Sequence, residues 1–216
     1  MKKTLATSLL LAVTLAPTLQ GCIPLVAAGA TQATLSAVDR RSLGTQTEDE
    51  TIEWKAAGNV STKAGEQSHT NFTSYNRKVL ITGEVPSEAI KAEVARLVAA
   101  IPQVKGVYDE LAIAPASSLS TRSQDSYITT KVKARLVDSG RVSAAHVKVV
   151  TEAGVVYLLG LVTQREADAA IQVARTTTDV KKVVNLFEII SDTEAKALEV
   201  KIEPQPAKQD SVTSGG

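Results

Sequence analysis

The chain has 216 residues, and its 24 basic and 23 acidic side chains give a formal net charge of +1. Because the charges are balanced, the protein has no net positive electrostatic potential that would attract nucleic acid, which argues against nucleic acid as a partner. Aromatic residues are few, with two Phe, one Trp and four Tyr. The core must therefore be built from Val, Ile, Leu and Ala, in one medium domain or two small ones.

The N-terminal segment has the order of a secretory signal, with two lysines, an apolar run and then Leu-Gln-Gly-Cys at 19–22. These four residues resemble the bacterial lipobox, which implies a signal peptide over 1–21 and acylation of Cys22, palmitate included. A plain signal ending at a free thiol is the alternative, but exported proteins seldom keep an unpaired cysteine. Ile23, rather than Asp, then implies sorting to the outer membrane, with the protein facing the periplasm.

The middle of the chain contains two copies of one pattern. The apolar stretch 79–85 aligns with 156–162, and at the same offset His69 falls on His146. We expect the copies to cover residues 47–115 and 123–191.

Each copy predicts the same order of elements. In the second copy Ile128, Val132 and Leu136 mark one face of a helix that Asp125 or Ser126 caps and that ends at Gly140. Further elements follow in the order strand, hairpin turn, strand, helix and strand: an alternating strand around 147–149, a turn at 152–154, a strand at 155–159, a helix from about 164 and a last strand at 183–190. This α-β-β-α-β order predicts an α+β fold in which two helices cover one face of a three-stranded sheet.

These features resemble the BON domain family. The resemblance rests on the apolar-Gly-x-Val segments at 80–85 and 158–162, the amphipathic helix after each, and the paired valines that open each closing strand. Two such domains behind a lipobox resemble the dual-BON outer-membrane lipoproteins. The remaining segments are expected to be a lipidated tether at 22–46, a linker at 116–122 and a largely disordered tail at 192–216, with a helix near its start.

Catalytic machinery is not expected. The sequence has no glycine-rich phosphate loop and no metal-ligand motif, so we predict no enzyme, no cofactor and no metal site. His69 and His146 each stand without a neighbouring cysteine or clustered carboxylates, whereas metal sites need three or four ligands. Both histidines are therefore expected on the surface. Trp54 is expected to pack on the other domain or on the N-terminal segment, with membrane contact as the alternative.

The charge differs between the two halves of the repeat, since residues 47–115 carry −3 and residues 122–190 carry +3. Tyr127, Lys131 and Arg135 share a stripe on the first helix of the second copy. An aromatic ring followed by cations suits an anionic membrane, at about 1 kcal/mol per cation. A solvated helix face is the competing interpretation from the residues alone. The resemblance implies the phospholipid site, for which we predict Tyr127, Thr130, Lys131, Lys133, Ala134 and Arg135.

The family resemblance also implies a role. We expect binding of anionic phospholipid by the second domain and support of outer-membrane integrity, at the division site and under envelope stress. Partners would be the membrane itself and outer-membrane assembly or cell-wall proteins. The alternative is a periplasmic protein-interaction or chaperone-like stress scaffold that does not recognise lipid specifically.

Overall fold

The structure is a computed structural model that describes residues 39–65 and 68–202, all within one compact unit. Cys22, the predicted signal peptide and the end of the tail lie outside the described residues. Among the helices that are described, none has the length and apolar character needed to cross a membrane.

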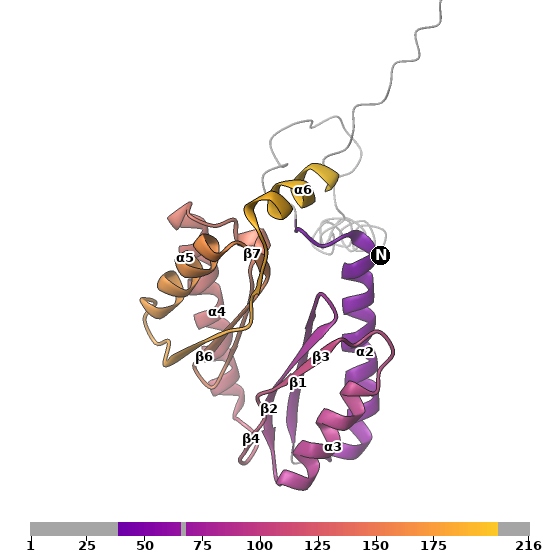
Figure 1. Ribbon diagram of the computed structural model, residues 1–216. Helices are drawn as coiled ribbons and strands as arrows, with labels where there is room; N and C mark the ends of the chain where they lie inside the picture. The colour runs from indigo at the N-terminus through magenta and orange to yellow at the C-terminus, as the bar shows by residue number, and fades with distance from the viewer. Residues whose placement is uncertain (1–38, 66–67, 203–216) are drawn as a thin grey trace, which may run out of the picture. The chain divides into compact units, whose positions relative to one another are not determined.

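The first domain is built on a helix and a hairpin. Its elements are α2 (Leu43–Ala64), β1 (His69–Tyr75), β2 (Lys78–Val85), α3 (Glu88–Ala99), β3 (Gly106–Asp109) and β4 (Ala112–Ile113). β1 pairs antiparallel with β2, and β3 and β4 both pair parallel with β2. Figure 1 shows α2 and α3 on the same side of this sheet. Ile52, Ala56 and Val60 of α2 are fully buried there against β2.

The second domain repeats this plan. Its elements are α4 (Leu119–Ser139), the short helix η3 (Ala144–His146), β5 (Lys148–Glu152), β6 (Val155–Leu159), β7 (Leu161–Val162), α5 (Gln164–Arg175), β8 (Lys182–Asn185) and β9 (Glu188–Ile189), followed by α6 (Asp192–Ile202). β6 lies between β5 and β8, and β7 pairs with β9. The predicted α+β fold is confirmed, although each closing strand is broken into two pieces.

The local signals of the second domain mostly act as expected. Gly140 ends α4 in the left-handed conformation, with φ at 59°. Val147 and Val149 are buried while Lys148 is exposed, as the alternation predicted. Thr163 begins α5 with a capping box that Glu166 completes.

The predicted start of α4 is wrong. The helix begins at Leu119, so residues 119–122 of the predicted linker are its first turn. Ser118 is the N-cap, because its side chain accepts the Thr121 N–H at 3.2 Å. Asp125 therefore lies inside the helix, where it is buried.

The central strands β2 and β6 are buried on both faces. One face of each lies under helices, and the other contributes to a cluster shared by the two domains. In that cluster Tyr75 and Leu80 of the first domain pack with Tyr157 and Leu159 of the second. This double burial explains why 79–81 and 155–159 are continuous apolar runs rather than alternating ones.

Candidate functional site

The outward face of α4 is the surface that the predicted site residues form. Ile128, Val132 and Leu136 are buried, and they fix which side of the helix faces the core. Tyr127 is 58 % exposed on the opposite side, and Thr130 and Ala134 are also exposed. The structure thus brings these predicted residues together on one solvent-facing surface.

Two further apolar residues extend this surface. Leu119 and Val137 are exposed, and neither was predicted as part of the site. At about 100° of rotation per residue, they lie within an arc of about 80° that also holds Tyr127, Thr130 and Ala134. We call these five residues the α4 outer stripe. Leu119 was missed because the helix was predicted to start too late, whereas Val137 lay within the predicted helix but was not included in the site.

The three predicted cations lie along the two edges of the α4 outer stripe. Lys133 is exposed on one edge and forms no ion pair within the described part of the chain. Lys131 and Arg135 lie on the other edge. Lys131 is half-buried, 4.8 Å from the centre of the Tyr127 ring, and its Nζ contacts Asp179 Oδ2 at 2.6 Å.

Arg135 is also held by the loop that follows α5. Its guanidinium donates to Thr177 Oγ1 at 2.9 Å and to Thr176 Oγ1 at 3.0 Å. The Lys131 ammonium likewise donates to the Thr178 carbonyl at 2.9 Å. The loop 176–179 therefore orients two of the three cations, a contact that helix periodicity could not reveal.

Trp54 of α2 is exposed in the middle of its helix, as Tyr127 is in α4. It is 81 % exposed on α2, so the prediction that it packs on the other domain is wrong. It lies off the buried face that Ile52 and Ala56 define, and it is therefore on a side of α2 that faces solvent. The N-terminal segment, its other predicted contact, lies outside the described residues.

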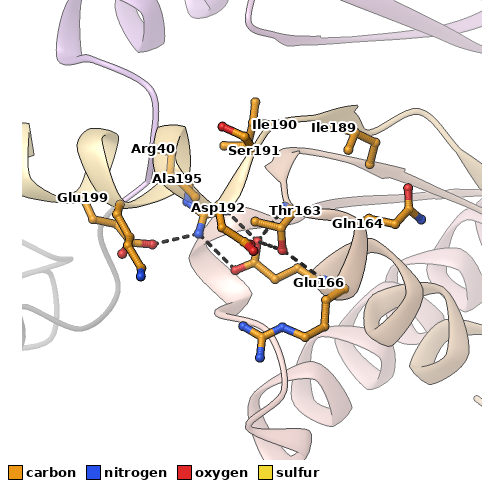
Figure 2. Close-up of a pocket in the computed structure, with 12 residues that line it drawn as sticks. Arg40, Thr163, Gln164, Glu166, Ile189, Ile190, Ser191, Asp192, Ala195 and Glu199 are labelled. Atoms are coloured by element: carbon orange, nitrogen blue, oxygen red, sulfur yellow. Dashed lines mark hydrogen bonds and ion pairs between the residues drawn. The ribbon is translucent and has the colours of Figure 1, made fainter.

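Arg40 anchors the segment before α2 to the second domain. Figure 2 shows it beside a pocket of about 720 Å³ between the start of α5 and α6. Its guanidinium donates to both carboxylate oxygens of Glu166, at 2.8 and 3.0 Å, and to Glu199 at 2.7 Å. Burial disfavours the charge on Glu166, but Arg40 and the Thr163 N–H outweigh it and lower the pKa to about 2. The charges of Arg40, Glu166 and Glu199 are thus paired with one another, so this cluster serves to hold the segment in place.

His146 lies beside this anchor rather than on the surface, so that prediction is wrong. Its ring is buried, with Nδ1 3.7 Å from Glu166 Oε1. Burial and the charge of Arg40 lower the pKa of His146. The tertiary fold, and not the local sequence, brings this ring beside Glu166 in the first turn of α5.

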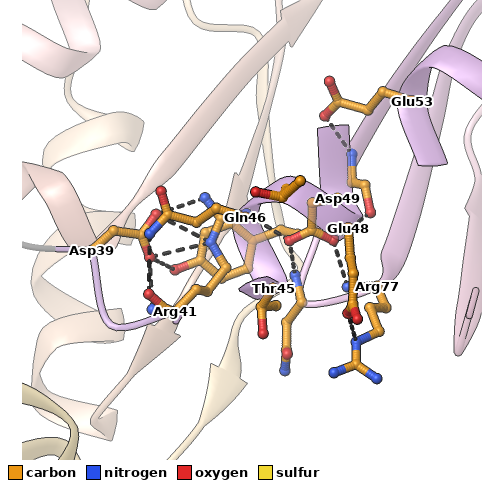
Figure 3. A network of polar contacts seen from close by, with 12 residues as sticks. Asp39, Arg41, Thr45, Gln46, Glu48, Asp49, Glu53 and Arg77 are labelled. Atoms are coloured by element: carbon orange, nitrogen blue, oxygen red, sulfur yellow. Dashed lines mark hydrogen bonds and ion pairs between the residues drawn. The ribbon is translucent and has the colours of Figure 1, made fainter. Parts of the chain in front are cut away.

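Arg41 anchors the same segment to the first domain. Figure 3 shows its contacts with Asp39 and Asp49. The guanidinium lies 2.6 Å from Asp39 Oδ2, 2.7 Å from Asp49 Oδ2 and 4.0 Å from the centre of the Tyr75 ring. Two adjacent arginines therefore fix one short segment to both domains. The Arg-Arg pair at 40–41 is the signal that could have indicated this.

His69 is also not a free surface residue. Its Nδ1 lies 3.3 Å from Glu84 Oε2 and 3.8 Å from Glu152 Oε1. The expectation that no carboxylates cluster near this histidine is wrong. The two glutamates are distant in sequence, and strand pairing and domain packing bring them together.

Comparison with known proteins identifies the two domains. A model of the BON domain matches residues 51–115 and 124–191. The chain belongs to the BON family. It is 40 % identical over 174 residues to the outer membrane lipoprotein DolP of Haemophilus influenzae, covering 80 % of this chain and 90 % of that protein. The predicted resemblance to the dual-BON outer-membrane lipoproteins is confirmed.

Other relatives of this chain carry different names. The chain is 37 % identical over 155 residues to the 21 kDa hemolysin of Actinobacillus pleuropneumoniae, covering 71 % of this chain and 80 % of that protein. It is 32 % identical over 133 residues to the osmotically-inducible protein Y of Escherichia coli, covering 57 % and 66 %. Proteins similar to this chain thus carry several names, and the role of this chain must be argued from its own surface.

Proposed function

We propose that this protein is a non-enzymatic outer-membrane lipoprotein that binds anionic phospholipid through α4 of its second BON domain. In this proposal Cys22 carries the lipid anchor, the domains face the periplasm, and the protein supports outer-membrane integrity at the division site. The similarity to a protein named as an outer membrane lipoprotein supports the location. The observation that carries the lipid-binding role is the α4 outer stripe with cations on both edges.

The chemistry of the stripe suits the headgroup layer of a bilayer. Apolar surface is exposed to water at three residues of the stripe, Leu119, Tyr127 and Val137, and it is more stable in the headgroup layer. The tyrosine hydroxyl can stay hydrated at the interface. Lys133 is free to pair with a phosphate, and Lys131 can exchange Asp179 for one. At about 1 kcal/mol per cation, three cations give a weak attraction. A lipid anchor raises the local concentration of bilayer, which makes such weak binding sufficient.

A flotation experiment tests this proposal. The chain from residue 22 onward, with Cys22→Ser so that no acyl chain binds by itself, is mixed with vesicles of phosphatidylglycerol or of phosphatidylcholine. We expect flotation only with phosphatidylglycerol, and a loss at higher salt because exposed charges are screened. The double variant Tyr127→Ser/Lys133→Gln should lose most of the binding.

The first domain supplies a matched control. Trp54→Ser/Lys55→Gln removes one exposed aromatic ring and one exposed cation from α2, the helix that corresponds to α4. This control should float like the parent chain. Equal losses in both double variants, or unchanged flotation of the α4 variant, would refute the assignment to α4.

The competing function is a periplasmic protein-interaction or stress scaffold. The similarity to the osmotically-inducible protein Y favours it, and the exposed Leu119 and Val137 could equally contact a protein. A stoichiometric partner among outer-membrane assembly or cell-wall proteins, together with no flotation, would support this alternative.

A further inference from the structure

One imidazole faces two buried carboxylates where the two domains meet. His69 Nδ1 lies 3.3 Å from Glu84 Oε2 and 3.8 Å from Glu152 Oε1. The ligand atoms of the three side chains all lie within 4.8 Å of one another. The side chains of Glu84 and Glu152 are each only 9 % exposed, so water solvates their charges poorly.

Three separate parts of the chain build this cluster. His69 opens β1 and is the direct cross-strand partner of Glu84 on β2. Glu152 ends β5 of the second domain. Ser117, just before α4, donates its N–H to Glu84 Oε2 at 3.0 Å. The cluster is specific to this junction, because Leu161 stands in the second copy at the position of Glu84.

The charges of this cluster are not balanced. Two carboxylates that are buried side by side repel each other and attract a positive group. Within the described residues, no lysine or arginine forms an ion pair with Glu84 or Glu152; only His69 approaches them. Asn71 donates to Glu152 Oε2 at 2.9 Å, but it brings no charge.

We propose that His69, Glu84 and Glu152 bind a divalent metal ion of the zinc class. One imidazole nitrogen and two carboxylate oxygens are a ligand set that Zn²⁺ accepts, with water as fourth ligand. Bonds of about 2.0–2.1 Å in tetrahedral geometry place neighbouring ligands about 3.3 Å apart. The two distances from Nδ1 are already near that value, and small side-chain rotations bring the carboxylates together around the ion.

Asn71 supplies an outer hydrogen bond to the cluster. Carboxylates that bind a metal are themselves held by hydrogen bonds. The side-chain amide of Asn71 donates to Glu152 Oε2 at 2.9 Å and so orients this carboxylate toward the ion. Because Glu152 comes from the second domain, the bound ion links the two BON domains. This inference is independent of the proposed lipid binding.

Zinc titration of the mature chain tests the inference. The Cys22→Ser chain is stripped with a chelator, dialysed, and titrated with ZnCl₂ by calorimetry, with native mass spectrometry to count ions. We expect one ion per chain, with much weaker binding of Mg²⁺ and Ca²⁺. Glu84→Gln and Glu152→Gln should each weaken binding about tenfold or more, since losing only an outer-shell partner already costs about 10–100-fold.

Two controls separate a lost ligand from a lost fold. Glu50→Gln removes an exposed carboxylate from α2 and should bind zinc like the parent chain. The circular dichroism of each metal-free variant should match that of the parent. In the parent chain, zinc should also shift the side-chain ¹⁵N resonances of His69 but not those of His146.

The opposite results would overturn the inference. These are no binding tighter than about 100 μM, where a bound ion would add little stability at ordinary metal concentrations, or binding that survives both glutamate substitutions. An imidazolium spectrum for His69 at pH 7.5 with zinc in excess would also overturn it, because a proton would then occupy Nδ1.

Discussion

Asp49 and Asp125 occupy the same place in the two repeats and make the same contacts. Asp49 accepts the backbone N–H groups of Asn76 at 2.8 Å and Arg77 at 2.7 Å. Asp125 accepts those of Ala153 at 2.9 Å and Gly154 at 2.8 Å. In each domain a buried carboxylate of the first helix thus holds the hairpin turn, whose residues have positive φ.

Removing this carboxylate should destabilise the second domain. We expect Asp125→Ala to lower the free energy of unfolding by about 3 kcal/mol or more, because two charge-assisted hydrogen bonds are lost and two amides lose their acceptor. Thermal unfolding followed by circular dichroism measures the loss. Asp138→Ala, an exposed change on the same helix, serves as control. Equal stability of the two variants would contradict this role of Asp125.

Gly83 and Gly160 should not tolerate a side chain. A Cβ at Gly83 would clash with the carbonyl oxygen of His69, and one at Gly160 with that of His146. Both obstacles are backbone atoms, so relief requires strands to move. We expect Gly83→Ala and Gly160→Ala each to lower the melting temperature of the protein, as measured by calorimetry.

The matched control for these glycines is Gly58→Ala. Nothing lies within 4 Å of a Cβ at this position in α2. Alanine favours a helix over glycine by about 1 kcal/mol, so this variant should be slightly stabilised. A similar destabilisation by all three substitutions would rule out the steric explanation.

The Arg40–Glu166 ion pair should make the free energy of unfolding fall at acidic pH. The pKa of Glu166 is lowered from its ordinary 4.5 to about 2, so the unfolded chain takes up this proton first as pH falls. The contribution of Glu166 is therefore complete above about pH 4.5 and disappears as pH falls through about 2. Urea unfolding at pH 6, 4 and 3 measures it.

The variant Glu166→Gln should be less stable than the parent chain at pH 6. The difference between the two should shrink steadily toward pH 3. Glu194→Gln, an exposed change on α6, should give a small difference that does not vary with pH in this way. A constant difference for Glu166→Gln would mean that its charge is not what stabilises the anchor.

The shared cluster should couple the unfolding of the two domains. Leu80 is buried on the face of β2 that packs with Tyr157 and Leu159. We expect Leu80→Ala to cost about 2–5 kcal/mol and to separate one calorimetric transition into two. Leu119→Ala changes an exposed leucine and should leave the transition unchanged. A single, unshifted transition for Leu80→Ala would contradict the coupling.

Local patterns in the sequence determined the elements of both domains. Ile128, Val132 and Leu136 recur on one face of α4, and they are buried as their spacing predicts. Gly140 ends that helix, and the capping box of Thr163 begins the next one. Such signals act between residues a few positions apart, where helix and strand geometry is fixed by the backbone. Because the first copy repeats the pattern of the second, the same elements could be predicted there.

Only the tertiary structure decided what those elements bring together. Asp125 looked like a helix cap from its neighbours, yet it holds a turn 28 residues away. His69 looked isolated, yet strand pairing gives it Glu84 and the second domain gives it Glu152. These contacts join positions that are far apart in the sequence, where the periodicity of helices and strands predicts nothing. They exist because β2 and β6 are apolar on both faces, and the hydrophobic effect packs the faces without helices against each other.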